Sequence, residues 1–306
     1  MMNTPIPIVS VVVTTYNRRE KLERALKSVL TQTLKELEVI VVDNASVDHT
    51  QELVEGLKDD RIKYIRHATN KGGPAARNTG IKAARASLIA FLDDDDQWQP
   101  EKLELQVNKF KDLSLSVGVV YVGAEIFDEL KQKVLKTNLP QWRGHVYQRL
   151  LLGTMLSSVS SVLVRAECFQ KVGLFDEDLT SCQDWDMWLR ISKQYEFDYV
   201  NEVLARINMH GKQISTNFAA MIPGRTRMVV KHQQEFAKFP AIYVIHLKRL
   251  GKMHCINGTW RLGIEWFMKA IKVNRFEAFK IVAWCVLELP VVKFTSNLKG
   301  FKRYEN

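Results

Sequence analysis

Residues 88–98 read Leu-Ile-Ala-Phe-Leu-Asp-Asp-Asp-Asp-Gln-Trp, so an apolar run passes directly into four consecutive aspartates. An apolar run of this length is typical of a strand buried on both faces. Further segments with the composition of strands lie at 8–13, 38–42, 62–65 and 117–122, and stretches with helical character separate them. Strands that alternate with helices predict an α/β protein with a mostly parallel sheet covered by helices on both faces.

Polar residues come directly after three of these strands. Thr14 and Tyr16 follow the first strand, Asp43 ends the second, and Asp93–Asp96 follow the strand at 88–92. Ligands of such sheets bind beyond the carboxyl ends of the strands. We therefore expect these side chains to gather on one rim of the sheet.

Four adjacent carboxylates at the end of a buried strand repel one another, so some of them need a cation or a proton. Mg²⁺ and Mn²⁺ are hard ions that take one or two carboxylates together with water and phosphate oxygens. Such an ion also stabilises a diphosphate leaving group. The run therefore predicts a site for Mn²⁺ or Mg²⁺, and the alternative is a solvated acidic turn.

Two residues on other loops are candidates for ligand contacts. Asp43 suits hydrogen bonds from a nucleobase or ribose, and the alternative is an Asx-turn or a helix N-cap. Arg77 follows the small residues 72–76, where a ligand can approach the backbone, and its cation suits phosphate or the acidic run. The segment has neither the Walker A spacing nor GxGxxG, so by itself it identifies no known phosphate-binding loop.

Two further candidates lie later in the chain. Residues 157–164 have the composition of a strand, and residues 184–191 have helical character. Asp184 and Asp186 point in different directions from such a helix, so at most one faces a given site. That one suits a general base toward an acceptor hydroxyl, and the alternative is that both acids complement the helix dipole. His210 is either a ligand or a packed polar residue.

Charge divides the chain into two parts. Residues 219–306 contain 16 Lys and Arg against 5 Asp and Glu, whereas residues 1–218 contain 28 against 29. We therefore predict two domains with these bounds, the second basic and mainly helical, with a helical hairpin at 251–283. Four separated cysteines support neither a disulfide framework nor a zinc site and fit a reducing compartment. The N-terminal run is a poor match to a signal peptide, and no run is long enough to span a membrane.

Aromatic residues accompany the positive charge of residues 219–306. They are Trp260, Trp266, Phe267, Phe276, Phe279, Trp284, Phe294, Phe301 and Tyr304. Basic residues with interfacial aromatics suit the surface of an anionic membrane. One alternative is a helical appendage with an aromatic core and solvated lysines. Another is a surface that binds a protein or a nucleic acid, although we do not expect a nucleic-acid partner.

Five segments together resemble glycosyltransferase family 2, over roughly residues 8–216. They are VSVVVTTYNR at 9–18, VVDNAS at 41–46, NKGGPAARN at 70–78, FLDDDDQW at 91–98 and QDW at 183–185. The resemblance implies the GT-A fold and an inverting, metal-dependent transfer of a sugar from a nucleotide-diphosphate donor, usually a UDP-sugar. It also implies a saccharide or lipid-linked saccharide acceptor, in bacterial surface polysaccharide or lipid-linked glycan synthesis.

The resemblance also implies roles for residues that bind the donor. Thr14, Tyr16 and Asp43 would surround the base, and Arg77 would lie near the phosphates. Asp93 and Asp94 would contact the ribose and the groups that surround the metal.

Three further positions match the metal site and the base of the family. Asp95 corresponds to the last aspartate of the DxD motif and is expected to bind the metal, with His210 near the diphosphate as a second ligand. Asp184 corresponds to the catalytic base. The sequence departs from the family where Gln183 replaces a common Glu and Asn44 replaces a common Asp, so no role is assigned to those two positions.

Two other functions compete with sugar transfer. A nucleotidyltransferase that makes sugar nucleotides needs a Gly-rich basic loop after the first strand, where this chain has Thr14-Thr15-Tyr16-Asn17. A catalytically inactive nucleotide-sugar-binding module has no need of both Asp95 and Asp184. We expect an enzyme in the cytoplasm, either free or peripheral on the inner face of the plasma membrane.

Overall fold

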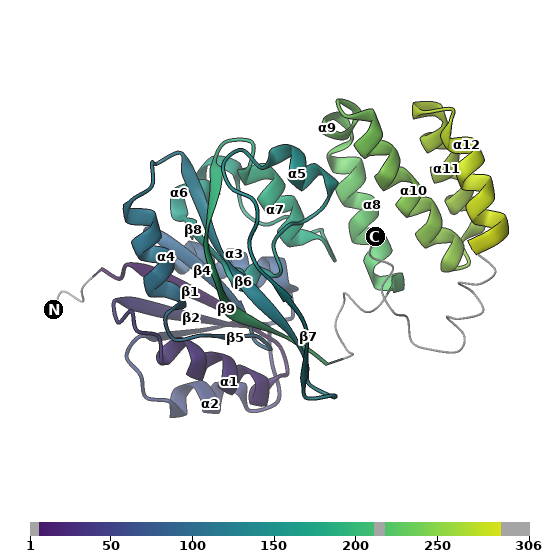
Figure 1. The fold of residues 1–306 in the computed structure, drawn as a ribbon. Helices are drawn as coiled ribbons and strands as arrows, with labels where there is room; N and C mark the ends of the chain where they lie inside the picture. Colours follow the sequence, from purple (N-terminus) through teal and green to yellow (C-terminus); the bar gives the residue numbers. More distant parts are fainter. Residues whose placement is uncertain (1–5, 211–217, 289–306) are drawn as a thin grey trace. The chain divides into compact units, whose positions relative to one another are not determined.

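The computed structural model describes residues 6–210 and 218–288 (Figure 1). The chain divides into two compact units, Met1–Asp178 with Gln183–His210, and Leu179–Cys182 with Gly211–Asn306. The first is an α/β unit, and the described residues of the second are mainly helical. The short segment Leu179–Cys182 therefore belongs with the helices, although the chain on both sides of it belongs with the sheet.

A sheet of nine strands forms the centre of the first unit, in the order β3-β2-β1-β4-β8-β6-β9-β5 with β7 paired to β6. The strands span Val9–Thr15 (β1), Leu37–Asp43 (β2), Ile62–Arg66 (β3), Leu88–Asp93 (β4), Gln97–Trp98 (β5), Val117–Asp128 (β6), Lys133–Asn138 (β7), Val162–Arg165 (β8) and Glu196–Met209 (β9). Strands β3, β2, β1 and β4 are parallel, whereas β8 lies antiparallel between β4 and β6. The predicted α/β class is confirmed, and the second half of the sheet is mixed.

Helices cover both faces of the sheet, as predicted. They are α1 (Arg19–Leu30), α2 (Thr50–Gly56), α3 (Gly73–Ala83), α4 (Lys102–Lys111), α5 (Tyr147–Leu152), α6 (Ala166–Val172) and α7 (Gln183–Ile191). Helices α1 and α4 share one apolar core with Val9, Val11 and Val13 of β1. Helix α3 packs on the other face, where a Cβ on Gly80 would lie 2.2 Å from Cγ1 of Val12, so only glycine permits this approach.

The strand predicted at residues 157–164 is shorter than expected. A 3₁₀ turn, η1 (Val159–Ser161), occupies the middle of the segment, and β8 begins at Val162. The hydroxyl of Ser158 accepts a hydrogen bond from the N–H of Ser160 at 3.1 Å. Serine hydroxyls that bond the local backbone compete with strand pairing, so the prediction was wrong before residue 162.

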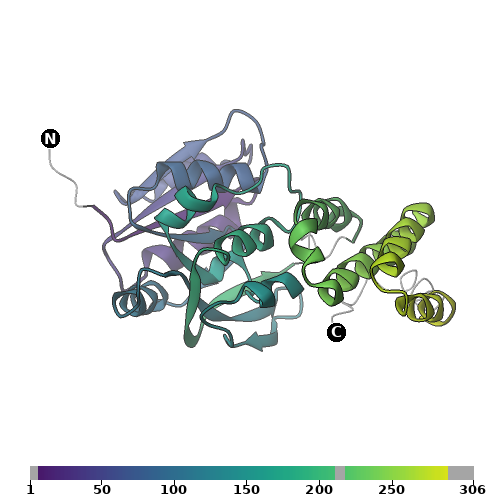
Figure 2. The same cartoon turned by 90° about the horizontal axis from the view of Figure 1, so that it is seen from above.

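The second unit contains α8 (Phe218–Lys231), α9 (Gln233–Ala237), α10 (Pro240–Ile256), α11 (Trp260–Val273), α12 (Glu277–Ala283) and a π-helical turn, η3 (Trp284–Glu288) (Figure 2). Helices α10 and α11 form a close antiparallel hairpin. A Cβ on Gly251 would lie 2.4 Å from the Phe267 ring, and one on Gly263 would lie 2.4 Å from Sγ of Cys255. The hairpin predicted at 251–283 thus begins earlier, at Pro240, and ends earlier, at Val273, because α12 is a separate helix. Over the described ranges, no helix is both long and apolar enough to cross a bilayer.

Candidate active site

Strand β4 carries the four aspartates to the carboxyl edge of the parallel strands. Asp93 is the last residue of β4. The N–H of Asp96 donates to the carbonyl of Asp93 at 3.0 Å, and this hydrogen bond closes a turn before β5. The side chain of Asp93 is 32% exposed, whereas Asp94, Asp95 and Asp96 are buried. The alternative of a solvated acidic turn is therefore wrong for three of the four carboxyl groups.

Asp96 is part of the structural framework behind the rim. Its Oδ2 accepts hydrogen bonds from the hydroxyls of Ser160 at 2.6 Å and Ser158 at 3.3 Å, and its Oδ1 accepts one from the N–H of Asn208 at 3.2 Å. Burial, together with the charges of Asp95 and Asp93, raises the pKa of Asp96 well above its ordinary value. The side-chain amide of Asn208 also donates to the carbonyl of Asp95 at 2.6 Å. These contacts join the acidic turn to η1 and β9.

Asp94 and Asp95 share a cation, Arg18. Its Nη1 lies 2.9 Å from Oδ1 of Asp94 and 3.1 Å from Oδ2 of Asp95, and the hydroxyl of Thr15 donates to Oδ2 of Asp94 at 2.8 Å. Burial raises the pKa of Asp94 to about 6, against the attraction of the Arg18 charge. Burial also opposes the charge of Arg18, but the carboxylates of Asp94 and Asp95 prevail and raise its pKa. The two carboxylates therefore share the positive charge of Arg18.

His210, at the end of β9, meets the same carboxylate. Its Nε2 lies 2.8 Å from Oδ2 of Asp95, and both side chains are about nine-tenths buried. One carboxylate oxygen and one imidazole nitrogen are thus side by side. The described residues contain no cluster of three or more His, Cys, Asp or Glu side chains able to hold a metal. The two groups suit a Mn²⁺ or Mg²⁺ ion whose other ligands are water and substrate phosphate oxygens.

Arg77 joins the acidic turn to the start of α7. Its Nη2 lies 2.6 Å from Oδ1 of Asp93, and its Nη1 donates to Oε1 of Gln183 at 3.1 Å. Its guanidinium carbon lies 5.7 Å from the centre of the Phe175 ring. Burial opposes the charge of Arg77, but Asp93 and then Asp184 outweigh it and raise its pKa. The structure therefore brings Arg77 together with the acidic turn, which was one of its two predicted partners.

Asp184 and Asp186 have different surroundings, as the helical spacing predicted. Asp184 is half-buried beside Gln183, and burial raises its pKa although the N–H of Trp185 and the Arg77 charge oppose this. Asp186 is fully buried, and its Oδ2 lies 2.9 Å from Nε of Arg190. Arg190 in turn donates to the carbonyls of Val172, Gly173 and Leu174. Asp186 is therefore bound in a buried ion pair with Arg190, and Asp184 is the acid on the Arg77 side of the helix.

The residues predicted around a nucleobase lie on the same rim. Thr14 is paired in register with Asp93, and Tyr16 is 44% exposed. Asp43 is buried, its Oδ1 accepts from the N–H of Ser46 at 2.8 Å, and its Oδ2 accepts from the hydroxyl of Tyr64. The side chain of Asp43 thus bonds the backbone three residues ahead, not two as in an Asx-turn, and its contact with a base stays a prediction.

A model of the Glycosyl transferase family 2 matches residues 10–173, which is more than half of the chain. The chain belongs to glycosyltransferase family 2. The matched region contains the acidic turn, Arg18 and Arg77, whereas Asp184 and His210 lie beyond it. A relative in Escherichia coli K12, named a putative colanic acid biosynthesis glycosyl transferase WcaA, is 29% identical over 272 residues, covering 83% of this chain and 91% of that protein.

Solved structures with low sequence identity share the fold of this family 2 chain. TarS of S. aureus in complex with UDP-GlcNAc matches with a TM-score of 0.66 at 17% identity, over 97% of this chain and 93% of that one. The mannosyltransferase PcManGT from Pyrobaculum calidifontis, in complex with GDP-Man and Mn²⁺, matches with a TM-score of 0.60 at 16% identity, over 96% and 85%. The chain therefore has the GT-A fold that its motifs implied.

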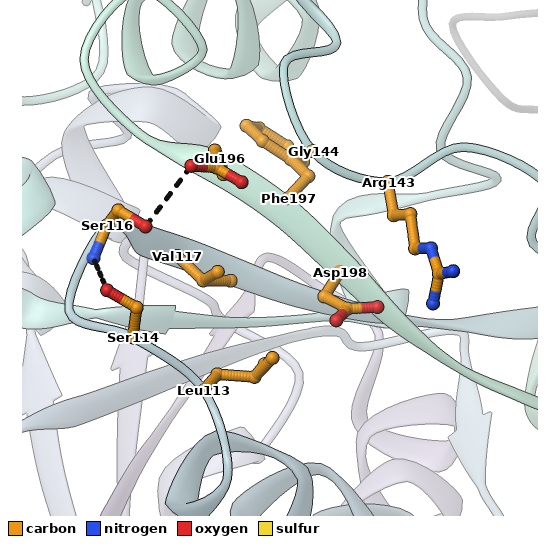
Figure 3. A pocket seen from close by; sticks show the side chains of 9 residues that line it. All are labelled: Leu113, Ser114, Ser116, Val117, Arg143, Gly144, Glu196, Phe197 and Asp198. Carbon is orange, nitrogen blue, oxygen red and sulfur yellow. Dashed lines mark hydrogen bonds between the residues drawn. The ribbon is translucent and has the colours of Figure 1, made fainter.

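A pocket of about 480 Å³ lies away from these residues (Figure 3). It is lined by Leu113, Ser114, Ser116, Val117, Arg143, Gly144, Glu196, Phe197 and Asp198. Val117 and Glu196 begin the parallel strands β6 and β9. Because β4 and β6 both run antiparallel to β8, this is the end of the sheet opposite to the acidic turn. The pocket is therefore separate from the candidate active site of this glycosyltransferase.

Sequence reasoning missed three residues of the site. Arg18 lies just after the first strand, and a cation on the rim opposite an acidic run is a signal that could have identified it. Ser160 and Asn208 support the acidic turn but come from η1 and β9, and nothing in their own sequence surroundings indicates that contact.

Proposed function

We propose that this chain transfers a sugar, with inversion, from a nucleotide-diphosphate donor to a saccharide acceptor, and that the donor is a UDP-sugar. One observation carries the proposal: Arg77 links Asp93, at the end of β4, to Gln183 in the first turn of α7, beside Asp184. A buried cation between a carboxylate rim and a half-buried acid suits a negatively charged diphosphate next to a base. Membership of family 2 and the UDP-GlcNAc complex of the structurally similar TarS support this choice.

Asp184 is the proposed general base. It takes the proton of the acceptor hydroxyl while the acceptor oxygen attacks the anomeric carbon of the donor. The bond from that carbon to the diphosphate oxygen breaks, and the nucleotide diphosphate leaves with the electron pair. A single displacement of this kind inverts the configuration of the anomeric carbon. Asp184 suits the role because burial raises its pKa, which brings the basicity of the carboxylate closer to working pH.

The donor would lie along the rim in an extended manner. We assign the ribose to Asp93, whose carboxylate is partly exposed, and the surroundings of the metal to Asp94. Arg77 is assigned to the phosphates, and Thr14, Tyr16 and Asp43 are assigned to the base. The exposed ring of Tyr16 offers a stacking surface.

Asp95 and His210 are the proposed ligands of Mn²⁺ or Mg²⁺. Such an ion, when bound, stabilises the charge that develops on the diphosphate. Arg18 already supplies positive charge to the same oxygen of Asp95. The Mn²⁺ in the complex of the structurally similar PcManGT supports a metal in this chain.

We assign the acceptor to the saccharides of bacterial surface polysaccharide or lipid-linked glycan synthesis. The support is the colanic acid relative in Escherichia coli, which this chain matches over most of its length. Transfer to a protein or to a small soluble metabolite, with none to a lipid-linked glycan, would contradict this assignment.

The test is a screen of nucleotide sugars with the purified protein, in Mn²⁺ and in chelator, reading nucleoside diphosphate release. We expect release with one or a few UDP-sugars, and an inverted linkage in the product by NMR. Pyrophosphate release from a sugar phosphate and a nucleoside triphosphate would identify a nucleotidyltransferase instead. Donor binding with no turnover toward any acceptor would favour an inactive binding module.

A further inference from the structure

The helical unit exposes large apolar side chains that its own core does not use. Helix α11 buries Gly263, Trp266, Phe267 and Ala270 on one side. Near the start of α12, Phe276 and Phe279 are 86% and 82% exposed. The expectation that the aromatics form the core of this unit therefore holds for Trp266 and Phe267 but not for Phe276 and Phe279.

The exposed apolar residues of α11 form a line along the helix. Trp260, Ile264 and Met268 recur every four residues, which places them above one another on one side. All three are exposed. We define the α11–α12 face as Trp260, Ile264, Met268, Phe276 and Phe279. Isolated exposed apolar residues are common on soluble proteins, but a helical line of them, followed in the sequence by two nearly fully exposed phenylalanines, is a candidate contact surface.

Basic residues lie among these apolar side chains. Residues 260–287 contain Arg261, Lys269, Lys272, Arg275 and Lys280 against two acids, Glu265 and Glu277. Glu277 is buried, and its carboxylate contacts Lys248 and Lys280. The surface charge of the segment is therefore positive, in keeping with the excess over residues 219–306.

We propose that the α11–α12 face binds the surface of an anionic lipid bilayer. The phenylalanines and the line on α11 enter the boundary between headgroups and acyl chains, and the basic residues contact anionic headgroups. Insertion at the surface fits the finding that no described helix is able to cross a bilayer.

The charge and the apolar residues of the α11–α12 face favour an anionic bilayer over a second copy of the chain and over a nucleic acid. A second copy of the chain would bring two positive faces together, and like charges oppose that contact. A nucleic acid offers bases that stack on aromatic rings, but Ile264 and Met268 have no counterpart in such a complex. An anionic bilayer uses both the apolar and the basic side chains.

Co-sedimentation of the full chain with vesicles tests the proposal. Vesicles of phosphatidylcholine with phosphatidylglycerol are compared with phosphatidylcholine alone, each at low and high salt. We expect binding to the anionic vesicles and its loss at high salt, because salt screens the headgroup attraction. Failure to bind anionic vesicles at low salt, or equal binding to both vesicle types, would overturn the proposal.

Two pairs of substitutions separate the apolar from the basic contribution. Phe276→Ser with Phe279→Ser should lower vesicle affinity roughly tenfold or more, because each ring loses its burial in the bilayer. Lys272→Gln with Arg275→Gln should lower it by about fivefold for each charge removed, the equivalent of about 1 kcal/mol per residue. Matched controls lie in the first unit, where Leu115→Ser with Leu130→Ser removes two exposed apolar residues and Lys133→Gln with Lys136→Gln removes two exposed basic residues. These control variants should bind vesicles as the unmodified protein does.

Two further measurements separate lipid binding from misfolding and from self-association. Circular dichroism melts of each variant identify any loss of folding. Sedimentation velocity without lipid reports self-association, and a dimer that the phenylalanine pair abolishes, with vesicle binding unchanged, would overturn the proposal in favour of a second copy. Nucleotide release toward a soluble acceptor should be the same in all variants, so vesicle binding and sugar transfer are judged separately.

Discussion

Nε2 of His210 lies 2.8 Å from Oδ2 of Asp95, although the two residues are 115 positions apart in the chain. Asp95 stands in the turn between β4 and β5, and His210 follows the last residue of β9. Nη1 of Arg18 lies 3.1 Å from the same oxygen. Two nitrogen-bearing side chains therefore converge on one carboxylate oxygen, and Asp95 and His210 are the groups that would hold a divalent cation there.

Replacement of Asp95 should remove most metal-dependent turnover and leave the fold intact. A metal ion contributes several kcal/mol to stabilisation of a leaving group, so Asp95→Ala should lower kcat/KM by about a hundredfold or more. His210→Ala should also lower kcat/KM, but by less, since it removes one proposed ligand and keeps the carboxylate of Asp95. Initial rates over a Mn²⁺ titration measure both, and thermal melts check folding.

A matched comparison distinguishes loss of the metal from general damage to the rim. Wild-type protein in chelator should behave as Asp95→Ala does in Mn²⁺, and chelator should have little further effect on the variant. Turnover of Asp95→Ala equal to that of the wild type would remove Asp95 from the proposed metal site.

Asp184 and Asp186 should give opposite results on activity and stability. Asp184→Asn keeps the size of a half-buried side chain but cannot take a proton, and a positioned base contributes on the order of 10²–10⁴-fold in rate. Donor affinity should change little. Asp186→Asn should keep most turnover but lower the free energy of unfolding by roughly 1–3 kcal/mol, because Arg190 loses its charged partner. If the two variants exchange these effects, the base is Asp186.

The strands and the rim could be predicted from the sequence because a strand buried on both faces is a continuous run of apolar residues. The runs at 8–13 and 88–92 read as strands since β1 and β4 are buried on both faces. The position of β8 between β4 and β6 depends on pairing between distant segments and has no such signal. The same limit applies to the four aspartates. Asp95 and Asp96 are identical neighbours, and the hydrogen bonds that Ser158, Ser160 and Asn208 donate from other elements make Asp96 part of the framework.

Asp94 should make the protein less stable as the pH rises through the mildly acidic range. Burial raises its pKa from 3.8 to about 6 in the folded chain, so the folded state keeps a proton that the unfolded state releases. Its contribution is therefore fully present below about pH 4 and is lost as the pH approaches 6, a change on the order of 3 kcal/mol. Urea denaturation of metal-free wild type and Asp94→Asn over this range measures it. The difference between the two should grow in favour of the variant as the pH rises, and a constant difference would contradict the assignment.

The position before Asp184 should control the pH at which the proposed base loses its proton. Burial raises the pKa of Asp184, and the Arg77 charge opposes the shift. Because the base acts only when deprotonated, kcat/KM should fall as the pH decreases through a pKa above the ordinary aspartate range. Gln183→Glu adds a like charge beside Asp184, which disfavours ionisation of the base, so this acidic limb should move to higher pH. Gln183→Met removes the hydrogen bond to Arg77 without adding charge and should leave the limb nearly in place. Asp184→Asn should lose the acidic limb of the kcat/KM profile, which assigns that limb to Asp184. If the limb then stays at the same pH in Gln183→Glu, the prediction is wrong and Arg77 neutralises the introduced carboxylate completely.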